Sequence, residues 1–380
     1  MGNGIWKLRV CAGYENGKKN IIQKHVQIDP KKTPGAQLKE AQKLTAKLEE
    51  EYENGSIAAV KSMTFAEYAQ HWEDTYCKRR GTAASTVKGY RDLLQGRILP
   101  ALGKLRLREI KPLTVNRFFQ AMEEETPKLS GTYIRKYFNL LHLILRCAVQ
   151  ERMISLNPTD CIEPPTKDTV KKPVYSAAQV ASLLEALQAT PLKWQAYTTL
   201  AMYTQMRRGE LIGLNWDNID FSQGLIHVEH SACYVPGAVP FLKAPKTRAG
   251  KRTIHVSKDA LEPLQQWRRE QASIRLLLGN AWQDEGAVFT QDNGVRLHVC
   301  TPTGWHKDFL EKNGLPHINL HGLRHTGASL LVADGLDYTS LSHRLGHSRP
   351  STSADLYSTA YEERDAAASE NLSRIFANSK

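Results

Sequence analysis

The sequence predicts a multidomain protein that is mainly α-helical with small β elements. Its 380 residues exceed the roughly 150 that one domain commonly holds, so two or three domains are expected. Apolar residues make up 41% and charged residues 24%, ordinary globular values that exclude a disordered or collagen-like chain. Helical periodicity fills most of the chain, whereas strand alternation is confined to its beginning and to residues 224–256.

Two further classes of protein are excluded by composition. No stretch approaches the roughly 18 uninterrupted apolar residues of a membrane span, and the first ten residues lack an apolar signal-peptide core. We therefore expect a cytoplasmic protein without a membrane partner. The six cysteines lie far apart with no CxxC pair, which favours reduced thiols over disulfides or a zinc knuckle, so no structural metal is expected.

The first domain, residues 1–60, is predicted to be a three-stranded sheet followed by a helix. Apolar and basic residues alternate along Trp6–Val10, so Lys7 and Arg9 share the face opposite the apolar one. A turn signal and a second apolar run follow, and residues 36–52 have helical periodicity. The basic face can enter a DNA groove, although Lys and Arg also protect the edges of small sheets.

The second domain, residues 64–156, is predicted to be a basic helical domain. It begins with a capping box at Thr64–Glu67, after which aromatic residues recur on one helical face as a core stripe. No strand pattern interrupts the helices that follow. The candidate DNA contacts are basic residues of these helices, namely Lys88, Arg91, Arg135 and Lys136.

The positive charge of the chain lies in this region. Residues 61–172 carry 20 lysines and arginines against 12 carboxylates, whereas residues 173–380 carry 21 against 20. A basic half joined to a nearly neutral half is typical of a nucleic-acid-binding region attached to another function. A solvated basic surface accounts for the charge equally well.

Residues 157–174 contain proline and charge clusters that predict an exposed linker to the third domain, residues 174–380. That domain begins with a capping box at Ser176–Gln179 and is mainly helical. Its β segment contains the candidate strands GLIHVEH, VPFLKAPK and KRTIHV, with a turn joining the last two into a hairpin that carries Lys246.

Short segments of the third domain carry groups suited to a phosphodiester. Arg207 separates two apolar helical runs, and Glu210 lies one helical turn beyond it. Three residues of HGLRHTG occupy positions i, i+3 and i+4, which lie on one helix face. LSHRLGH ends a further helix, and a tyrosine follows ten residues after its last histidine. The groups of these last three segments are His321, Arg324, His325, His347 and Tyr357.

In this order the segments resemble those of the tyrosine recombinases, the phage-type integrases, and they are most similar to integrases of conjugative transposons and phages of Gram-positive bacteria. The resemblance covers essentially the whole chain. It implies an arm-type DNA-binding domain, a helical core-binding domain and a mixed α/β catalytic domain with a C-terminal tail. Two residues depart from the family pattern: Gln205 stands where glycine is usual, and Gly322 stands where many members have an acidic residue.

The resemblance also implies the residues of the site. The implied catalytic set is Arg207, Lys246, His321, Arg324, His347 and the nucleophile Tyr357, with Glu210 and His325 in supporting positions. The chemistry favours these residue types, because permanently charged guanidinium groups can neutralise a phosphorane-like transition state and histidine can donate or transfer protons. Tyr361 is a rival nucleophile, but the spacing from His347 to Tyr357 is the family's.

We therefore predict a site-specific DNA recombinase that integrates and excises a mobile element through a 3′-phosphotyrosyl intermediate, without metal, ATP or other cofactor. Its expected partners are double-stranded DNA at core and arm sites, three further copies of itself in a tetramer on DNA, and an accessory excision factor. The resemblance implies a bacterial cytoplasmic protein that lies on the nucleoid when DNA is bound. The alternatives are a solitary type IB topoisomerase or resolvase, or a catalytically silent architectural DNA-binding protein.

Overall fold

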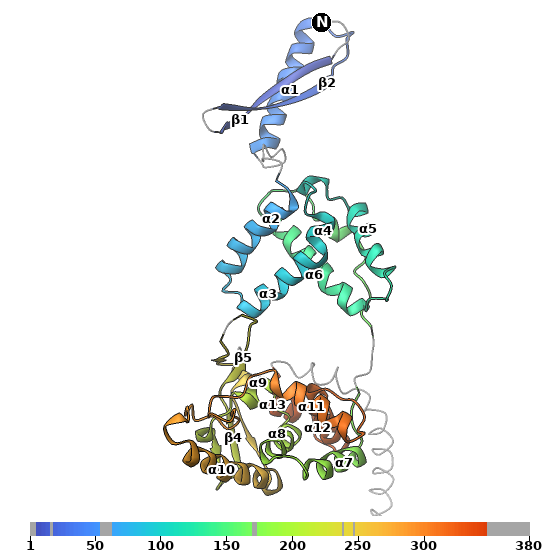
Figure 1. The fold of residues 1–380 in the computed structure, drawn as a ribbon. Helices are drawn as coiled ribbons and strands as arrows, with labels where there is room; N and C mark the ends of the chain where they lie inside the picture. Colours follow the sequence, from blue (N-terminus) through green and yellow to red (C-terminus); the bar gives the residue numbers. More distant parts are fainter. Residues whose placement is uncertain are drawn as a thin grey trace, which may run out of the picture. The chain divides into compact units, whose positions relative to one another are not determined.

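The protein divides into two compact units, residues 1–170 and 171–380 (Figure 1). The computed structural model describes residues 5–15, 18–53, 63–168, 173–237, 239–245 and 248–347. Within these ranges no helix is long and apolar enough to cross a membrane.

The chain begins with an antiparallel pair of strands, β1 (Ile5–Glu15) and β2 (Lys18–Gln27), and the helix α1 (Pro34–Glu53) packs against one face of it (Figure 1). The predicted alternation is confirmed, since Leu8 and Val10 are buried against α1 while Lys7 and Arg9 are exposed. The expected third strand is absent from the described residues. The two apolar runs extend into strands of 11 and 10 residues, and a short turn then leads directly into α1.

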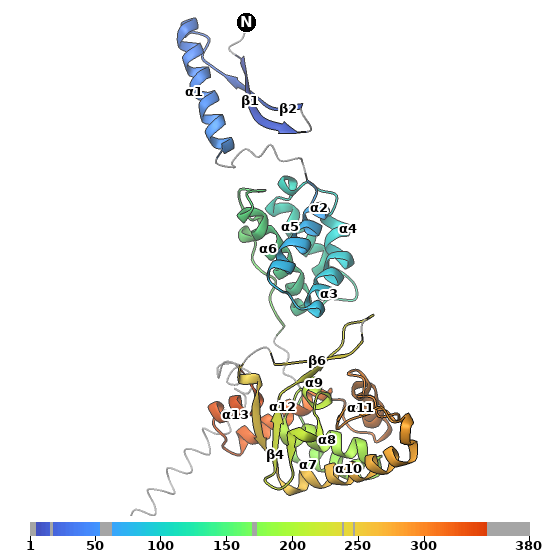
Figure 2. The same ribbon diagram turned by 90° about the vertical axis from the view of Figure 1, so that its left-hand side faces the viewer.

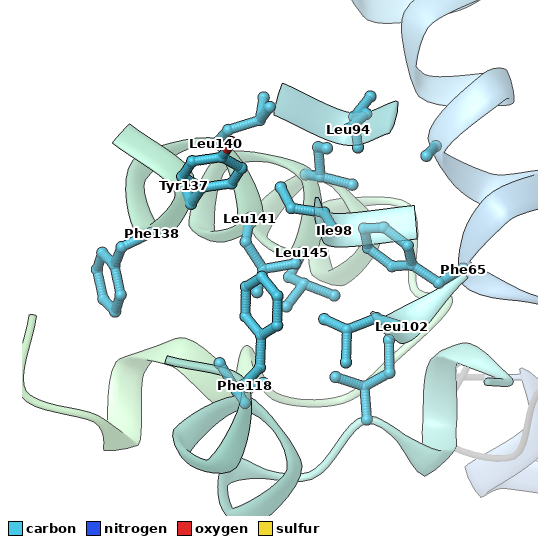
Figure 3. Close-up of a cluster of buried hydrophobic side chains, with 14 of the residues drawn as sticks. Phe65, Leu94, Ile98, Leu102, Phe118, Tyr137, Phe138, Leu140, Leu141 and Leu145 are labelled. Carbon is cyan, nitrogen blue, oxygen red and sulfur yellow. The ribbon is translucent and has the colours of Figure 1, made fainter. Parts of the chain in front are cut away.

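The rest of the first unit is helical. Its elements are α2 (Phe65–Trp72), a π-helical turn (Glu73–Cys77), α3 (Ala84–Leu93), a second π-helical turn (Leu94–Ile98), α4 (Leu99–Leu102), a 3₁₀ turn (Leu107–Glu109), α5 (Pro112–Glu123), α6 (Gly131–Gln150) and a last 3₁₀ turn (Pro158–Cys161). The predicted capping box at Thr64 is present. Phe65, Tyr68 and Trp72 are fully buried, which confirms the aromatic stripe as core. Figure 3 shows side chains of α2, α5 and α6 meeting in this core.

The beginning of the predicted exposed linker is instead packed against α6. Asn157 and Thr159 are only 5% and 1% exposed. The Nδ1 atom of His142, on α6, is hydrogen-bonded to the Thr159 hydroxyl at 2.8 Å. The Asn157 side-chain amide donates to the His142 carbonyl at 3.3 Å. Polar side chains that find partners on a neighbouring helix can be buried, so the turn signals there mark a short 3₁₀ turn.

In the second unit, α8 is the central helix, and several other helices pack against it. The helices of the unit's described part are α7 (Ala177–Leu187), α8 (Leu192–Thr204), α9 (Arg208–Ile212), α10 (Lys258–Leu278), α11 (Thr301–Lys312), α12 (Leu320–Ala333) and α13 (Tyr338–Leu345). The helix α8 packs against both α10 and α12 (Figure 1), and most of its side chains are buried. The predicted capping box at Ser176 is present at the start of α7.

The described residues of the second unit also form five short strands: β3 (Ile219–Asp220), β4 (Leu225–Val228), β5 (Ser231–Cys233), β6 (Phe241–Lys243) and β7 (Arg252–His255). The predicted hairpin between the last two strands is wrong for the described residues, because β7 pairs with β4 and β6 pairs with β5. Pro245 follows β6 and has no N–H with which to extend a ladder toward β7. Figure 2 shows β6 at the edge of the unit.

Candidate active site

The first arginine of the site lies at a break between two helices. The helix α8 ends at Thr204, whose buried hydroxyl donates to the Leu200 carbonyl at 2.6 Å and accepts from the Met206 N–H at 3.3 Å. Arg207 then adopts an extended backbone conformation at the N-terminus of α9, with φ −69° and ψ 150°. The Arg207 side chain is partly exposed, with 42% of its surface accessible.

A buried carboxylate holds this arginine. Glu210 is 4% exposed, accepts from the Arg207 guanidinium at 2.8 Å, and accepts from the Arg207 N–H at 2.9 Å. Two contacts from one carboxylate to both the backbone and the side chain fix the direction of the guanidinium.

Glu210 has a second cationic partner that sequence inspection missed. Arg252 of β7, with a side chain only 1% exposed, donates to Glu210 at 2.8 Å and to the Arg344 carbonyl at 2.7 Å. Burial by itself would raise the pKa of Glu210, but Arg252 and Arg207 hold that pKa below its ordinary value. The alternation in KRTIHV puts Arg252 on the same inward face as Ile254, which was the available signal.

Arg324 joins the segments that were recognised separately in the sequence. It lies on α12, is 3% exposed, and donates to the Gln205 carbonyl at 2.5 Å and to the Leu345 carbonyl at 2.7 Å. The same guanidinium lies 3.1 Å from the His347 Nε2 atom. Arg324 thus links the end of α8, the end of α13 and His347.

His347 is directed by the end of α13. Gly346 has φ 65°, a left-handed conformation suited to glycine, and the His347 N–H donates back to the Ser342 carbonyl at 3.0 Å. Burial, followed by the charges of Arg324, Arg207, Arg252 and His321, lowers the pKa of His347 to about 4. The ring is therefore neutral at pH 7. Because a guanidinium only donates, Nε2 accepts from Arg324 and the ring proton is on Nδ1.

Both histidines of α12 lie near its N-terminus. His321 is exposed and His325 is 5% exposed, and their rings meet edge to face with centroids 4.6 Å apart. Between them, a Cβ atom at Gly322 would lie 2.4 Å from the Ile318 Cγ1 atom. The acidic side chain that many tyrosine recombinases have at this position does not fit here without a shift of Ile318.

The described part of the chain thus brings together Arg207, Glu210, Arg324 and His347. Lys246 and Tyr357 lie outside the described residues. Within those residues, no group of three or more His, Cys, Asp and Glu side chains could hold a metal ion. The guanidinium groups of Arg207, Arg252 and Arg324 outnumber the carboxylate of Glu210 here, so this region has an excess of positive charge suited to an anion.

The candidate DNA-contact residues of the helical domain differ in their partners within the protein. Lys136 is exposed, and Lys88 pairs with Asp92 one turn away at 2.9 Å. Arg91 binds the largely buried Glu73, with Nε at 2.8 Å from the carboxylate. Arg135 donates to the Pro165 carbonyl at 3.0 Å and lies over the ring of Phe138. The last two arginines therefore contribute to folding of the helical domain in this structure.

Comparisons with known proteins agree with this arrangement. Residues 174–364 match the model of the phage integrase family, and residues 64–122 match the model of the phage integrase N-terminal SAM-like domain. A XerC-like tyrosine recombinase of Caldanaerobacter subterraneus is 25% identical over 99% of this chain and 97% of its own length. The integrase of Mycobacterium phage L5 is 26% identical over 84% of this chain and 81% of its own.

Solved structures show the same fold. The integrase of transposon Tn1549, solved in complex with a circular intermediate DNA, superposes with a TM-score of 0.67 and 22% identity, covering 80% of this chain and 99% of that one. A lambda integrase dimer bound to a COC′ core site superposes with a TM-score of 0.59 and 17% identity, covering 94% of this chain and 93% of that one.

Proposed function

Since this chain belongs to the phage integrase family of tyrosine recombinases, enzymes that cleave and rejoin DNA strands, we propose that it integrates and excises a mobile DNA element through a 3′-phosphotyrosyl intermediate. The proposal depends on one observation above others. Arg207 and Arg324 donate to neighbouring carbonyls, those of Gly346 at 3.4 Å and Leu345 at 2.7 Å, so their guanidinium groups converge beside His347.

In the proposed reaction, the scissile phosphate binds between these two guanidinium groups. The Tyr357 oxygen attacks phosphorus, a P–O bond to tyrosine forms, and the P–O bond to the 5′-oxygen breaks. A tyrosine hydroxyl with a pKa of about 10 is a poor nucleophile in water, and the surrounding positive charge favours its phenolate. Lys246 protonates the departing 5′-oxygen. The energy of the phosphodiester is retained in the phosphotyrosine, so a 5′-hydroxyl of the partner strand can reverse the step.

The histidines have distinct tasks in this scheme. His347 is neutral and carries its proton on Nδ1. The Nδ1–H group can therefore donate to a non-bridging phosphate oxygen while Nε2 accepts from Arg324. His321 is exposed at the start of α12 and supplies a further donor. Glu210 orients Arg207, and His325 supports His321 through their ring contact.

The remaining parts of the chain bind DNA and other copies in this proposal. Residues 1–60 bind arm sites through the exposed face of β1, residues 64–156 bind the core site, and residues 174–380 carry the catalytic centre and tail. Lys136 is exposed and Lys88 pairs with the exposed carboxylate of Asp92, so these two lysines are the preferred phosphate contacts. Arg91 instead binds a largely buried carboxylate and Arg135 a backbone carbonyl. Four copies assemble on two duplexes, on the nucleoid, and an accessory factor directs excision.

The test is the covalent adduct. Tyr357→Phe should abolish a protein–DNA adduct on a nicked suicide substrate while DNA binding stays nearly intact, because only one hydroxyl is lost. Tyr361→Phe is the matched control and should still form the adduct, and EDTA should not prevent it. An adduct formed by the Tyr357→Phe variant but not by its control would assign the nucleophile to Tyr361.

A further inference from the structure

Gln205 is a buried glutamine with a backbone conformation that favours glycine. Its φ is 50° and its ψ 29°, in the left-handed region, and the residue is only 3% exposed. We propose that Gln205 is a positioning residue that sets α12 and α13 relative to Arg207, and so places Arg324 and His347. This inference rests on the proposed function of those two residues.

The Gln205 side chain connects the end of α8 to α13. Its Nε2 amide donates to the Met202 carbonyl at 2.5 Å, and its Oε1 atom accepts from the Arg344 Nε at 2.8 Å. Arg344 also donates to the Tyr203 carbonyl at 2.6 Å. Arg344 lies three residues before His347, so these contacts hold the last turn of α13 against the end of α8.

The Gln205 backbone connects the same place to α12. Its carbonyl accepts from the Arg324 guanidinium at 2.5 Å, and the left-handed conformation determines where that carbonyl points. A residue that left this conformation would move the acceptor away from Arg324. Glycine populates several conformations at little cost and would hold the carbonyl less firmly.

The surface of α12 leaves room for this side chain. A Cβ atom at Gly327 would lie 2.8 Å from the Gln205 Nε2 atom and 2.8 Å from the Met202 carbonyl oxygen. Gly327 lies one turn after Arg324, so α12 closely approaches the end of α8 where the glutamine amide is inserted. The glutamine thus contacts the end of α8, α12 and α13, and because it is buried it acts through Arg324 and His347.

The central experiment is Gln205→Gly in the full chain. Glycine keeps the left-handed backbone accessible and removes the two side-chain contacts. Single-turnover cleavage should fall roughly 10–100-fold, as expected when catalytic groups are displaced by a fraction of an ångström, while core-site affinity stays within a few-fold. Gln205→Glu keeps an oxygen for Arg344 and loses the donor to Met202, so it should recover part of the rate.

Two further measurements separate positioning from general packing. The pKa of His347 can be followed by NMR in ¹³C-histidine-labelled protein and assigned with His347→Asn. It should rise from about 4 toward its ordinary value as the ring becomes less buried and moves away from the charges of Arg324, Arg207, Arg252 and His321. Arg344→Met should reproduce the rate loss, and the double variant should be no slower than either single one, because both changes remove the same link.

The control for the backbone is Arg152→Gly. Arg152 is exposed, has φ 59°, and lies in the other unit, so this change relieves the same left-handed conformation away from the site. It should leave the His347 titration unchanged.

Each outcome decides the proposal. Cleavage at the wild-type rate in Gln205→Gly would overturn it. A slower rate that follows a lower melting temperature, with the His347 titration unchanged, would overturn it as well and make Gln205 a packing residue. If the wild-type protein formed no adduct, the proposed function would fail, yet the His347 titration in Gln205→Gly would still test the positioning.

Discussion

Replacing Arg252 with methionine is expected to destabilise the second unit by about 3–4 kcal/mol at pH 7. The side chain of Arg252 is 1% exposed and that of Glu210 is 4% exposed. Removing one partner of a buried ion pair costs about 3–5 kcal/mol, because it leaves the other charge buried. Glu210 keeps Arg207 at 2.8 Å, which puts the expected cost in the lower part of that range.

The pH dependence follows from the sign of the Glu210 shift. Burial raises the pKa of this carboxyl, but its arginine partners hold it below the ordinary 4.5. A depressed carboxyl pKa contributes stability that is fully present above the unfolded pKa and is lost as pH falls through the folded pKa. The difference between wild type and Arg252→Met should therefore be largest near neutral pH and should shrink below about pH 4.5.

The assay is calorimetry of the full chain with a matched exposed pair. For a unit of about this size, the predicted cost corresponds to a melting-temperature decrease of roughly 6–16 °C. Arg275 and Asp284 lie in the same unit at the same 2.8 Å separation but are 59% and 45% exposed. Arg275→Met should cost under about 1 kcal/mol. Equal decreases in the two variants, or an Arg252→Met effect that does not depend on pH, would refute the reasoning.

Three further predictions concern parts of the chain outside the described site. Lys246→Ala should cleave normal DNA slowly and recover on a 5′-bridging phosphorothioate, since a thiolate leaves without a proton; equal defects on both substrates would make Lys246 a phosphate contact only. Deleting residues 1–60 should remove arm-site binding and spare core-site cleavage in gel-shift and adduct assays, so unchanged arm affinity would contradict it. Leu372, Ile375 and Phe376 stand at positions i, i+3 and i+4 of the tail sequence and form an apolar stripe that needs a partner surface. Leu372→Ala with Phe376→Ala should therefore weaken cooperative filling of a second half-site in ultracentrifugation; unchanged assembly with a lower melting temperature would assign the tail to its own domain.

Local signals in the sequence predicted many element boundaries correctly. The capping boxes at Thr64 and Ser176 begin helices, and Gly346 ends one, because caps depend on residues within one turn. The alternation at the start of β1 also separated its buried and exposed faces, since side chains of a strand point to opposite sides. The segments that carry the site were likewise recognisable, because each is a short run of residues.

Strand pairing could not be obtained in this way. The third N-terminal strand and the hairpin between β6 and β7 were expected and are not found among the described residues. Periodicity marks a segment as extended, but its partner depends on where the rest of the chain folds.

The partners of the charged residues were decided by tertiary structure alone. Arg91 and Arg135 carry the positive charge expected of DNA contacts. Each nevertheless binds a group of the first unit, 18 positions away for Arg91 and 30 for Arg135. Glu210 and Arg252 are 42 positions apart, and Gln205 and Arg344 are 139 apart. An arginine carries the same charge wherever it lies in the sequence, and only the packing of distant segments determines whether it meets a buried carboxylate, a carbonyl or an accessible anion site.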